Sequence, residues 1–255
     1  MGIEFGTLYI ALPCIEGRVI CTDKSVNNED GMVRTDMVKI HRLGKKAAFT
    51  LTGLAYAPSL SNAPVFDPKE TVKAFFADKN LNYIDKQRQA LACTLQKAIH
   101  SALITRCGVP GIPPEKTGCQ VLVSFLDAHN ILRAFRIEVS FDELRTEKAR
   151  ASISDVDVSL PDLSGHCDPF VAICGGTFPE VEYLRRDPRF EVVAHRAPEL
   201  RGLAAREVAG IARYIIRACS QASPVVTPQN ISISEESDCC VLDRNQGFYW
   251  LNEEP

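Results

Sequence analysis

The stretch GTLYIALPCIEGRVICTD, residues 6–23, contains two short runs rich in strand-forming residues. These runs cover residues 7–12 and 18–22, and the tetrapeptide Cys-Ile-Glu-Gly between them is typical of a turn. The pattern predicts a β-hairpin at the start of the chain. A second strand pair is predicted over residues 38–43 and 47–52, around Gly-Lys-Lys. The chain is therefore expected to open with four strands.

Helices are predicted to follow these strands. Asp67, Pro68 and Glu70 form a capping pattern with proline at the first helical position. A longer helix is predicted over about residues 85–106, where leucine and isoleucine recur at four-residue spacing. The rest of the chain is predicted to form strands at 120–126, 131–139, 149–156 and 170–174, helices at 179–186 and 203–221, and strands at 231–234, 239–242 and 248–251.

The order of these elements indicates the fold class. The predicted order is strands, helices, strands, helices and strands. This order differs from the strict βαβ alternation of a parallel sheet. The order predicts an α+β fold in which two antiparallel sheets are stacked and flanked by helices. No internal repeat, low-complexity segment or convincing domain boundary is found. With 255 residues, of which 45% are hydrophobic, the chain can bury one large core as a single domain.

Composition argues against several classes of protein. Charged residues make up 24% and the net charge is −3, without the basic footprint of a nucleic-acid-binding protein. No apolar run approaches the roughly 20 residues that a membrane span needs. The apolar stretch at 8–15 is short and follows Glu4 rather than a basic segment, which argues against a cleaved secretory signal. We therefore expect a cytoplasmic protein with no nucleic-acid or membrane partner.

The chain contains ten cysteines, whose redox state can be predicted from their spacing and surroundings. No pair shows the Cys-x-x-Cys spacing of zinc sites or redox motifs. Several stand inside apolar runs, where cysteine behaves as a small hydrophobic residue. We predict reduced, buried thiols in a cytosolic protein. The adjacent Cys239 and Cys240 could be redox-active, but burial in a strand is the favoured interpretation.

Five residues of the first 53 match the pattern of a known family. Gly6 precedes Thr7 just before a strand, Asp23 ends the second strand sixteen residues after Thr7, Lys39 follows in a Val-Lys-Ile context, and Gly53 follows Phe-Thr-Leu-Thr. This part of the chain resembles the proteasome β-subunits and the bacterial HslV peptidase. The resemblance implies a four-layer αββα sandwich of the Ntn-hydrolase type. It also implies a propeptide over residues 1–6, autocatalytic removal at Gly6–Thr7, and one hydrolase domain over 7–255.

The chemistry of an N-terminal threonine explains why these residue types are needed. A threonine hydroxyl is a poor nucleophile until a base removes its proton, and a chain-terminal threonine supplies that base from its own α-amine. This amine titrates near ~8, and the ammonium of Lys39 would lower its pKa further. Asp23 could hold Lys39 charged and in position. The backbone N–H of Gly53 could stabilise the oxyanion, and residues 1–6 must be removed because an amide nitrogen cannot act as the base.

The carboxy-terminal half matches the family less closely. Residues 170–176 resemble the strand whose end usually carries a serine near the nucleophile, and Cys174 stands at its place. Residues 205–209 resemble the start of the last long helix, which usually carries an aspartate. Ala218 stands at that aspartate's place, with Ser220 or Ser223 nearby. These departures predict a weakened peptidase. Residues 141–165 and the proline-containing stretch after residue 53 are interpreted as insertions that could reshape the cleft.

The resemblance implies a threonine endopeptidase subunit of a self-compartmentalising complex. Its substrates would be peptides or unfolded proteins, its assembly a homo-oligomeric ring, and its partner an ATPase unfoldase. Asn27, Leu51 and Ala55 are predicted to shape the substrate pocket. Two alternatives stay open, namely an inactive ring subunit with a structural role and an N-terminal nucleophile hydrolase that acts on small amides. No cofactor is expected, and the five histidines are not spaced as metal ligands.

Structural interpretations of the same residues also stay open. Thr7 could simply begin an edge strand, where threonine is common. Asp23 could be a turn residue, and Lys39 a solvated strand lysine. Cys174 has no identifiable activating neighbour and is expected to be a buried structural thiol rather than a nucleophile. A Ser/His/Asp mechanism has no support, because no Gly-x-Ser-x-Gly elbow is present.

Overall fold

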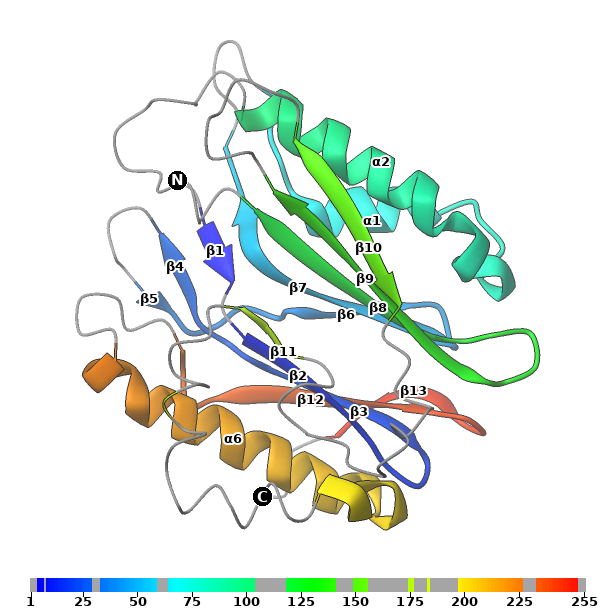
Figure 1. Ribbon diagram of the computed structural model, residues 1–255, viewed down its shortest axis with the longest axis vertical. Helices are drawn as coiled ribbons and strands as arrows, with labels where there is room; N and C mark the ends of the chain where they lie inside the picture. The colour runs from blue at the N-terminus through cyan, green and yellow to red at the C-terminus, as the bar shows by residue number, and fades with distance from the viewer. Residues whose placement is uncertain are drawn as a thin grey trace.

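The computed structural model describes residues 4–6, 8–28, 33–58, 64–103, 118–140, 149–155, 174–176, 183, 197–226 and 233–251. Within these ranges the chain forms two antiparallel sheets and three α-helices (Figure 1). This confirms the predicted α+β class with two antiparallel sheets. Among the same residues, no helix is long and apolar enough to cross a membrane.

The larger sheet has eight strands in the order β10-β9-β8-β7-β1-β4-β5, with β6 also paired to β7. Its strands are β1 (Glu4–Gly6), β4 (Val26–Asn28), β5 (Val33–Arg34), β6 (Ile40–Leu43), β7 (Ala47–Tyr56), β8 (Cys119–Leu126), β9 (Leu132–Ser140) and β10 (Arg150–Asp155). The smaller sheet has the order β11-β2-β3-β12-β13. Its strands are β2 (Leu8–Pro13), β3 (Gly17–Asp23), β11 (Cys174–Gly176), β12 (Ser237–Asp243) and β13 (Gly247–Trp250).

The helices are α1 (Pro68–Phe76), α2 (Ile84–Leu103) and α6 (Ala205–Val226), with short 3-10 segments η1 (Leu81–Tyr83) and η4 (Ala197–Gly202). Helix α1 begins as predicted: the side chain of Asp67 accepts a hydrogen bond from the N–H of Glu70, and Pro68 stands in the first turn. Helix α2 buries Leu91, Leu95 and Ile99 along one face, as their four-residue spacing predicts.

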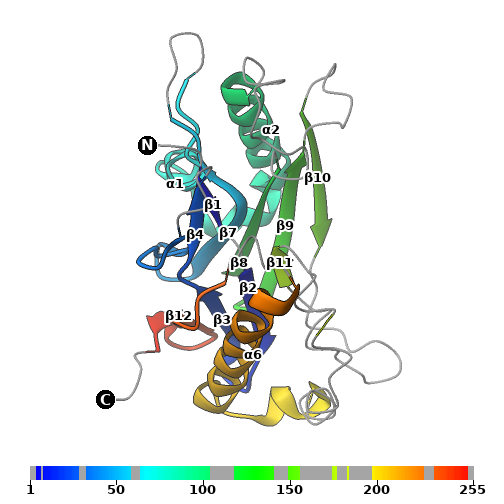
Figure 2. The ribbon, with the colours of Figure 1, turned by 90° about the vertical axis from the view of Figure 1, so that its left-hand side faces the viewer.

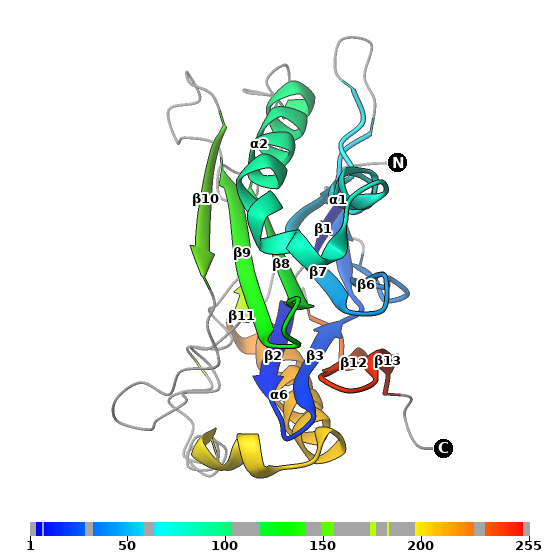
Figure 3. The same ribbon diagram turned by 90° about the vertical axis from the view of Figure 1, so that its right-hand side faces the viewer.

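Three layers of apolar side chains hold the elements together. One lies between helices α1 and α2 and the outer face of the larger sheet, and contains Phe49, Leu91 and Val123. A second lies between α6 and the smaller sheet. A third joins the two sheets, with Tyr9 and Ala48 among its members. Figures 2 and 3 show the resulting stack, with α2 on one outer side and α6 on the other.

The structure corrects the expected end of the second hairpin. The sequence predicts a strand that ends at residue 52, but β7 continues to Tyr56 and the next helix begins at Pro68. The continuation is stabilised because β1 supplies a hydrogen-bonding partner for this end of β7. The strands β4 and β5 were not predicted, because they are only three and two residues long.

Three other predicted elements fall partly outside the described residues. Of the helix predicted at 179–186, only Tyr183 is described, in helical conformation. Of the strand predicted at 231–234, the described residues Ile233 and Ser234 lie outside any strand. Ile233 instead packs in the core beside α6, and its carbonyl accepts a hydrogen bond from the Ser220 hydroxyl. The predicted strand at 170–174 is described only from Cys174, where β11 begins.

The prediction that the thiols are reduced is wrong for two cysteines. Cys21 of β3 and Cys239 of β12 form a disulfide across 218 residues of sequence. They are directly opposite each other in adjacent antiparallel strands, so the sheet register brings their sulfurs together. The prediction holds for the free Cys14 and Cys119, whose burial raises their thiol pKa values to about 11 and about 12.

Candidate active site

The carboxylate of Asp23, at the last residue of β3, is the centre of the candidate site. Its Oδ1 accepts hydrogen bonds from the backbone N–H of Leu8 at 2.9 Å and from Nζ of Lys39 at 2.7 Å. Its Oδ2 accepts from the N–H of Ser25 at 3.0 Å and from the Ser25 hydroxyl at 2.6 Å. Donors surround a fully buried carboxylate, which explains how it is tolerated without solvent. Asp23 is therefore a fixed hydrogen-bond acceptor rather than an exposed turn residue.

Lys39 stands just before β6, and only 3% of it is exposed to solvent. Burial lowers the pKa of its ammonium group, while the negative charge of Asp23 opposes that shift. A buried ion pair of this kind persists only with close geometry and further hydrogen bonds, and both are present around Asp23. The alternative that Lys39 is a solvated strand lysine is excluded by this burial.

Thr7, the predicted nucleophile, lies outside the described residues, but both of its neighbours are described. Gly6 ends β1 in the larger sheet, and Leu8 begins β2 in the smaller sheet. The N–H of Leu8, which belongs to the peptide unit after Thr7, donates to Asp23. The chain therefore passes from one sheet to the other at this position, and Asp23 holds the peptide on its carboxy-terminal side.

Gly53 lies directly opposite Gly6 in the pairing of β7 with β1. Its φ of +76° falls in the left-handed region. A Cβ atom at this position would meet the carbonyl oxygen of Gly118 at 2.4 Å. Both observations require glycine here, independently of any role of its N–H in catalysis. The oxyanion role stays a prediction.

The three predicted pocket residues occupy different environments. Asn27 lies on β4 opposite Phe5 of β1, and it is 4% exposed. Leu51 packs in the core between the helices and the larger sheet. Ala55 lies near the end of β7 and is 8% exposed. Asn27 is therefore paired with Phe5, the residue that directly precedes Gly6 and Thr7.

Cys174 and Ala218 stand at the places where the family resemblance implies a serine and an aspartate. Cys174 begins β11 opposite Ile10, whereas the β11 residue opposite Leu8 is Gly176. Ala218 packs against the core beneath α6 and offers no acid. The hydroxyl of Ser220 donates to the carbonyl of Ile233 at 2.8 Å and so holds the segment before β12. Ser223 is fully buried.

Ser25 is a residue of the candidate site that the sequence analysis did not identify. Its hydroxyl and its N–H both donate to one oxygen of Asp23. The available signal was the pattern Asp-Lys-Ser at 23–25, since an aspartate often accepts hydrogen bonds from the residue two positions on.

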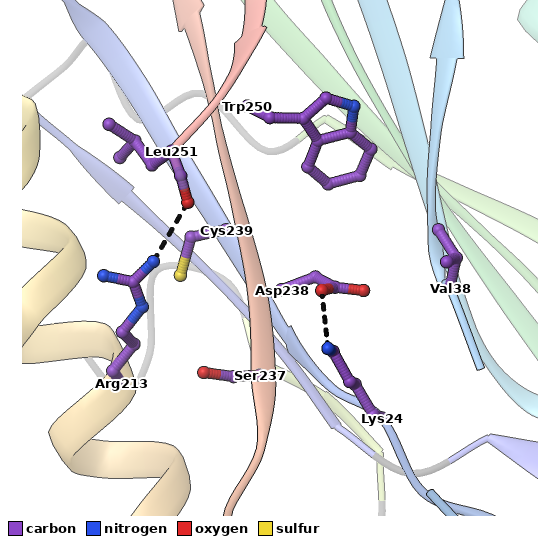
Figure 4. A pocket seen from close by; sticks show the side chains of 8 residues that line it. All are labelled: Lys24, Val38, Arg213, Ser237, Asp238, Cys239, Trp250 and Leu251. Carbon is purple, nitrogen blue, oxygen red and sulfur yellow. Dashed lines mark hydrogen bonds and ion pairs between the residues drawn. The ribbon is translucent and has the colours of Figure 1, made fainter. Parts of the chain in front are cut away.

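A pocket of about 530 Å³ is lined in part by residues next to Asp23 and Lys39 in the chain (Figure 4). Its wall includes Lys24 and Val38, the chain neighbours of the pair, and also Arg213, Ser237, Asp238, Cys239, Trp250 and Leu251. Nζ of Lys24 lies 3.2 Å from Oδ1 of Asp238, and Nη2 of Arg213 donates to the carbonyl of Leu251 at 3.0 Å. Lys24 and Asp238 thus pair their charges within the wall, whereas Arg213 contacts a neutral carbonyl group. Across the described ranges, no group of three His, Cys, Asp or Glu residues could hold a metal ion.

No family model and no curated protein matches this chain. The functional interpretation therefore rests on the geometry around Asp23 and on the spacing of Thr7, Asp23, Lys39 and Gly53 in the sequence.

Proposed function

We propose that this chain is a threonine-type peptidase subunit of a proteasome-like, self-compartmentalising complex, with the Ntn-hydrolase form of the αββα sandwich. The observation that carries the proposal is the double contact of Asp23. Its Oδ1 bonds both the ammonium of Lys39 and the N–H that follows Thr7. Asp23 could thus orient both the ammonium group of Lys39 and the peptide group that follows Thr7. Such positioning suits a nucleophile that a neighbouring base must activate.

Removal of residues 1–6 at Gly6–Thr7 would free the α-amine of Thr7. That amine would then take the proton from the threonine hydroxyl as the oxygen attacks a substrate carbonyl. The 2.7 Å contact with Asp23 favours the charged form of Lys39 against the effect of burial, and a positive charge there would lower the pKa of the amine. The same positive charge favours the oxyanion that forms in the transition state.

The pairing of β1 supports a peptide as the substrate. Glu4–Gly6 forms antiparallel pairs with β7 on one side and with β4 on the other. Removal of this segment would leave the hydrogen-bonding groups of β4 and β7 facing an empty strand position. An extended peptide could occupy that position by strand addition, and its cleaved carbonyl would stand where Gly6 stands now.

The proposal includes three properties that the resemblance implies. The subunits would form a homo-oligomeric ring, an ATPase unfoldase would deliver unfolded chains, and the complex would act in the cytoplasm. Cytosolic thiols keep most cysteines reduced. In a cytoplasmic protein, the Cys21–Cys239 disulfide would therefore have to form and persist in a reducing environment.

The structure also favours a second candidate, a ring subunit without peptidase activity. Ala218 supplies no acid, and Ser220 is engaged with Ile233. Residues 4–6 fill the strand position that a substrate would need. If the segment before Thr7 is never removed, β1 remains a permanent strand and the α-amine is never freed.

Intact mass and N-terminal sequencing of the purified protein separate the two candidates. We expect a chain that begins at Thr7 and that cleaves unfolded casein and fluorogenic peptides. Thr7→Ala is the matched control and should retain residues 1–6 and lack hydrolysis. A wild-type chain that still carries residues before Thr7 after prolonged incubation would support the inactive ring subunit.

A further inference from the structure

The side chain of Asn27 is a buried polar group near the candidate site that the proposed mechanism does not use. It is 4% exposed, and its Oδ1 is fully shielded from solvent. Among the described residues, no group donates a hydrogen bond to this oxygen. Buried carbonyl oxygens in folded proteins nearly always have a partner, because an unmade hydrogen bond is costly. This oxygen can therefore accept a hydrogen bond from a donor that is placed beside it.

The pairing of β1 with β4 shows where that donor would come from. Asn27 lies directly opposite Phe5, and the neighbouring pairs Glu4–Asn28 and Gly6–Val26 continue the same register. Residues directly opposite each other in an antiparallel pair project their side chains to the same face, with Cβ atoms about 4.5–5.5 Å apart. A bound peptide that took the same register would place the side chain of its corresponding residue beside the amide of Asn27. The chain itself has phenylalanine at that position, and a phenylalanine side chain carries no hydrogen-bond donor.

We propose that Asn27 is a specificity-determining residue, which selects an uncharged hydrogen-bond donor at the second residue before the cleaved bond. Glutamine or asparagine would donate from its side-chain amide to Oδ1 of Asn27. An ammonium group fits less well, because at a site this shielded it would lose hydration without a carboxylate in return. The inference rests on the proposed function, because it assumes that a peptide replaces β1 between β4 and β7.

The first test uses the full-length chain and needs no peptidase activity. Thr7→Ala keeps residues 1–6 attached, and Phe5→Gln is combined with Asn27→Leu in a double-mutant cycle of urea unfolding. We expect Phe5→Gln to favour the folded state about fivefold more in the Asn27 background than in the Asn27→Leu background. Asn27→Ala serves as a second variant in case leucine distorts the strand. Asn28→Leu is the matched control, because position 28 pairs with Glu4 rather than with Phe5. Equal effects in all backgrounds would overturn the inference.

The second test measures kcat/KM for peptides that carry glutamine or leucine at the second residue before the cleaved bond. We expect the wild-type enzyme to prefer glutamine about tenfold, and Asn27→Leu to abolish the preference, because a site that hydrogen-bonds a substrate rejects analogues without the donor. Equal rates for both peptides in the wild type would also overturn the inference. If no peptide is cleaved, the proposed function fails, and the unfolding cycle alone decides whether Asn27 recognises the opposite side chain.

Discussion

Nζ of Lys39 lies 2.7 Å from Oδ1 of Asp23, and both side chains are almost completely shielded from water. The same oxygen holds the N–H of Leu8, so the charge pair is connected to the chain that leaves Thr7. Removing either partner leaves the other as an unpaired buried charge. This relationship makes both the stability of the fold and the chemistry of the site sensitive to single substitutions.

Asp23→Asn should destabilise the protein by about 3–5 kcal/mol, because the ammonium of Lys39 loses its counter-charge while it stays buried. Urea unfolding of Thr7→Ala backgrounds measures the change without interference from processing. Asp238→Asn is the matched control. It breaks the partly exposed ion pair with Lys24 and should cost less than about 1 kcal/mol. Equal costs for the two substitutions would contradict the buried-pair geometry.

Ser25→Ala should slow the release of residues 1–6 and cost about 1–3 kcal/mol of stability. The reason is that Asp23 Oδ2 loses its 2.6 Å hydrogen bond from the serine hydroxyl. The time course of processing, followed by intact mass, and urea unfolding measure the two effects. Ser25→Thr retains a hydroxyl and should recover most of the processing rate. If Ser25→Thr is as slow as Ser25→Ala, the hydroxyl is not what positions Asp23.

Gly53→Ala should destabilise the fold by about 1–3 kcal/mol or more, because an alanine would have to adopt a positive φ. Its Cβ would also stand 2.4 Å from the carbonyl oxygen of Gly118. Gly210→Ala in α6 is the matched control, since no atom lies within 4 Å of the added Cβ. That control should be neutral or stabilising by up to about 1 kcal/mol. Thermal unfolding distinguishes the pair, and a harmless Gly53→Ala would contradict the described backbone.

His41 should make the fold sensitive to acid. Burial, reinforced by the positive charges of Lys69 and Lys73, lowers its pKa from 6.5 to about 4. His41 of the unfolded chain therefore becomes protonated below about pH 6.5, whereas His41 of the folded chain becomes protonated only near pH 4. The free energy of unfolding consequently falls as the pH drops from 6.5 to about 4. The loss attributable to His41 is about 3 kcal/mol.

The measurement for His41 is urea unfolding at pH 7 and at pH 4.5. In His41→Phe, which keeps a ring beside Phe49, we expect a clearly smaller loss of stability between the two pH values. The exposed His129→Gln serves as the control and should behave as the wild type does. An unchanged pH dependence in His41→Phe would show that His41 is not the group responsible.

Reduction of the Cys21–Cys239 disulfide should lower stability by about 2–5 kcal/mol, because the bond closes a loop of 218 residues in the unfolded chain. Thermal unfolding with and without dithiothreitol measures the difference. The double variant Cys21→Ala with Cys239→Ala should show no response to the reductant. Cys93→Ser, which removes a free cysteine on α2, should respond as the wild type does. Alkylation of both cysteines in the unreduced, unfolded protein would contradict the disulfide.

Periodicity predicted the hairpin of β2 and β3 and the helices α1 and α2 correctly, because a residue's neighbours two to four positions away set these patterns. The family resemblance of residues 6–53 also implied the contact between Asp23 and Lys39 that the structure shows. Strands β1 and β4 carried no such signal. Three residues are too few for a period to be recognised.

The sequence by itself therefore determined the local elements and the residue types of the candidate site. Only the tertiary structure decided that residues 4–6 lie between β4 and β7, that Cys21 meets Cys239, and that Ser25 completes the surroundings of Asp23. The physical reason is that these contacts satisfy backbone groups, charges and thiols across long separations. Which distant partner satisfies them depends on how the two sheets pair and stack, and no short window of sequence contains that information.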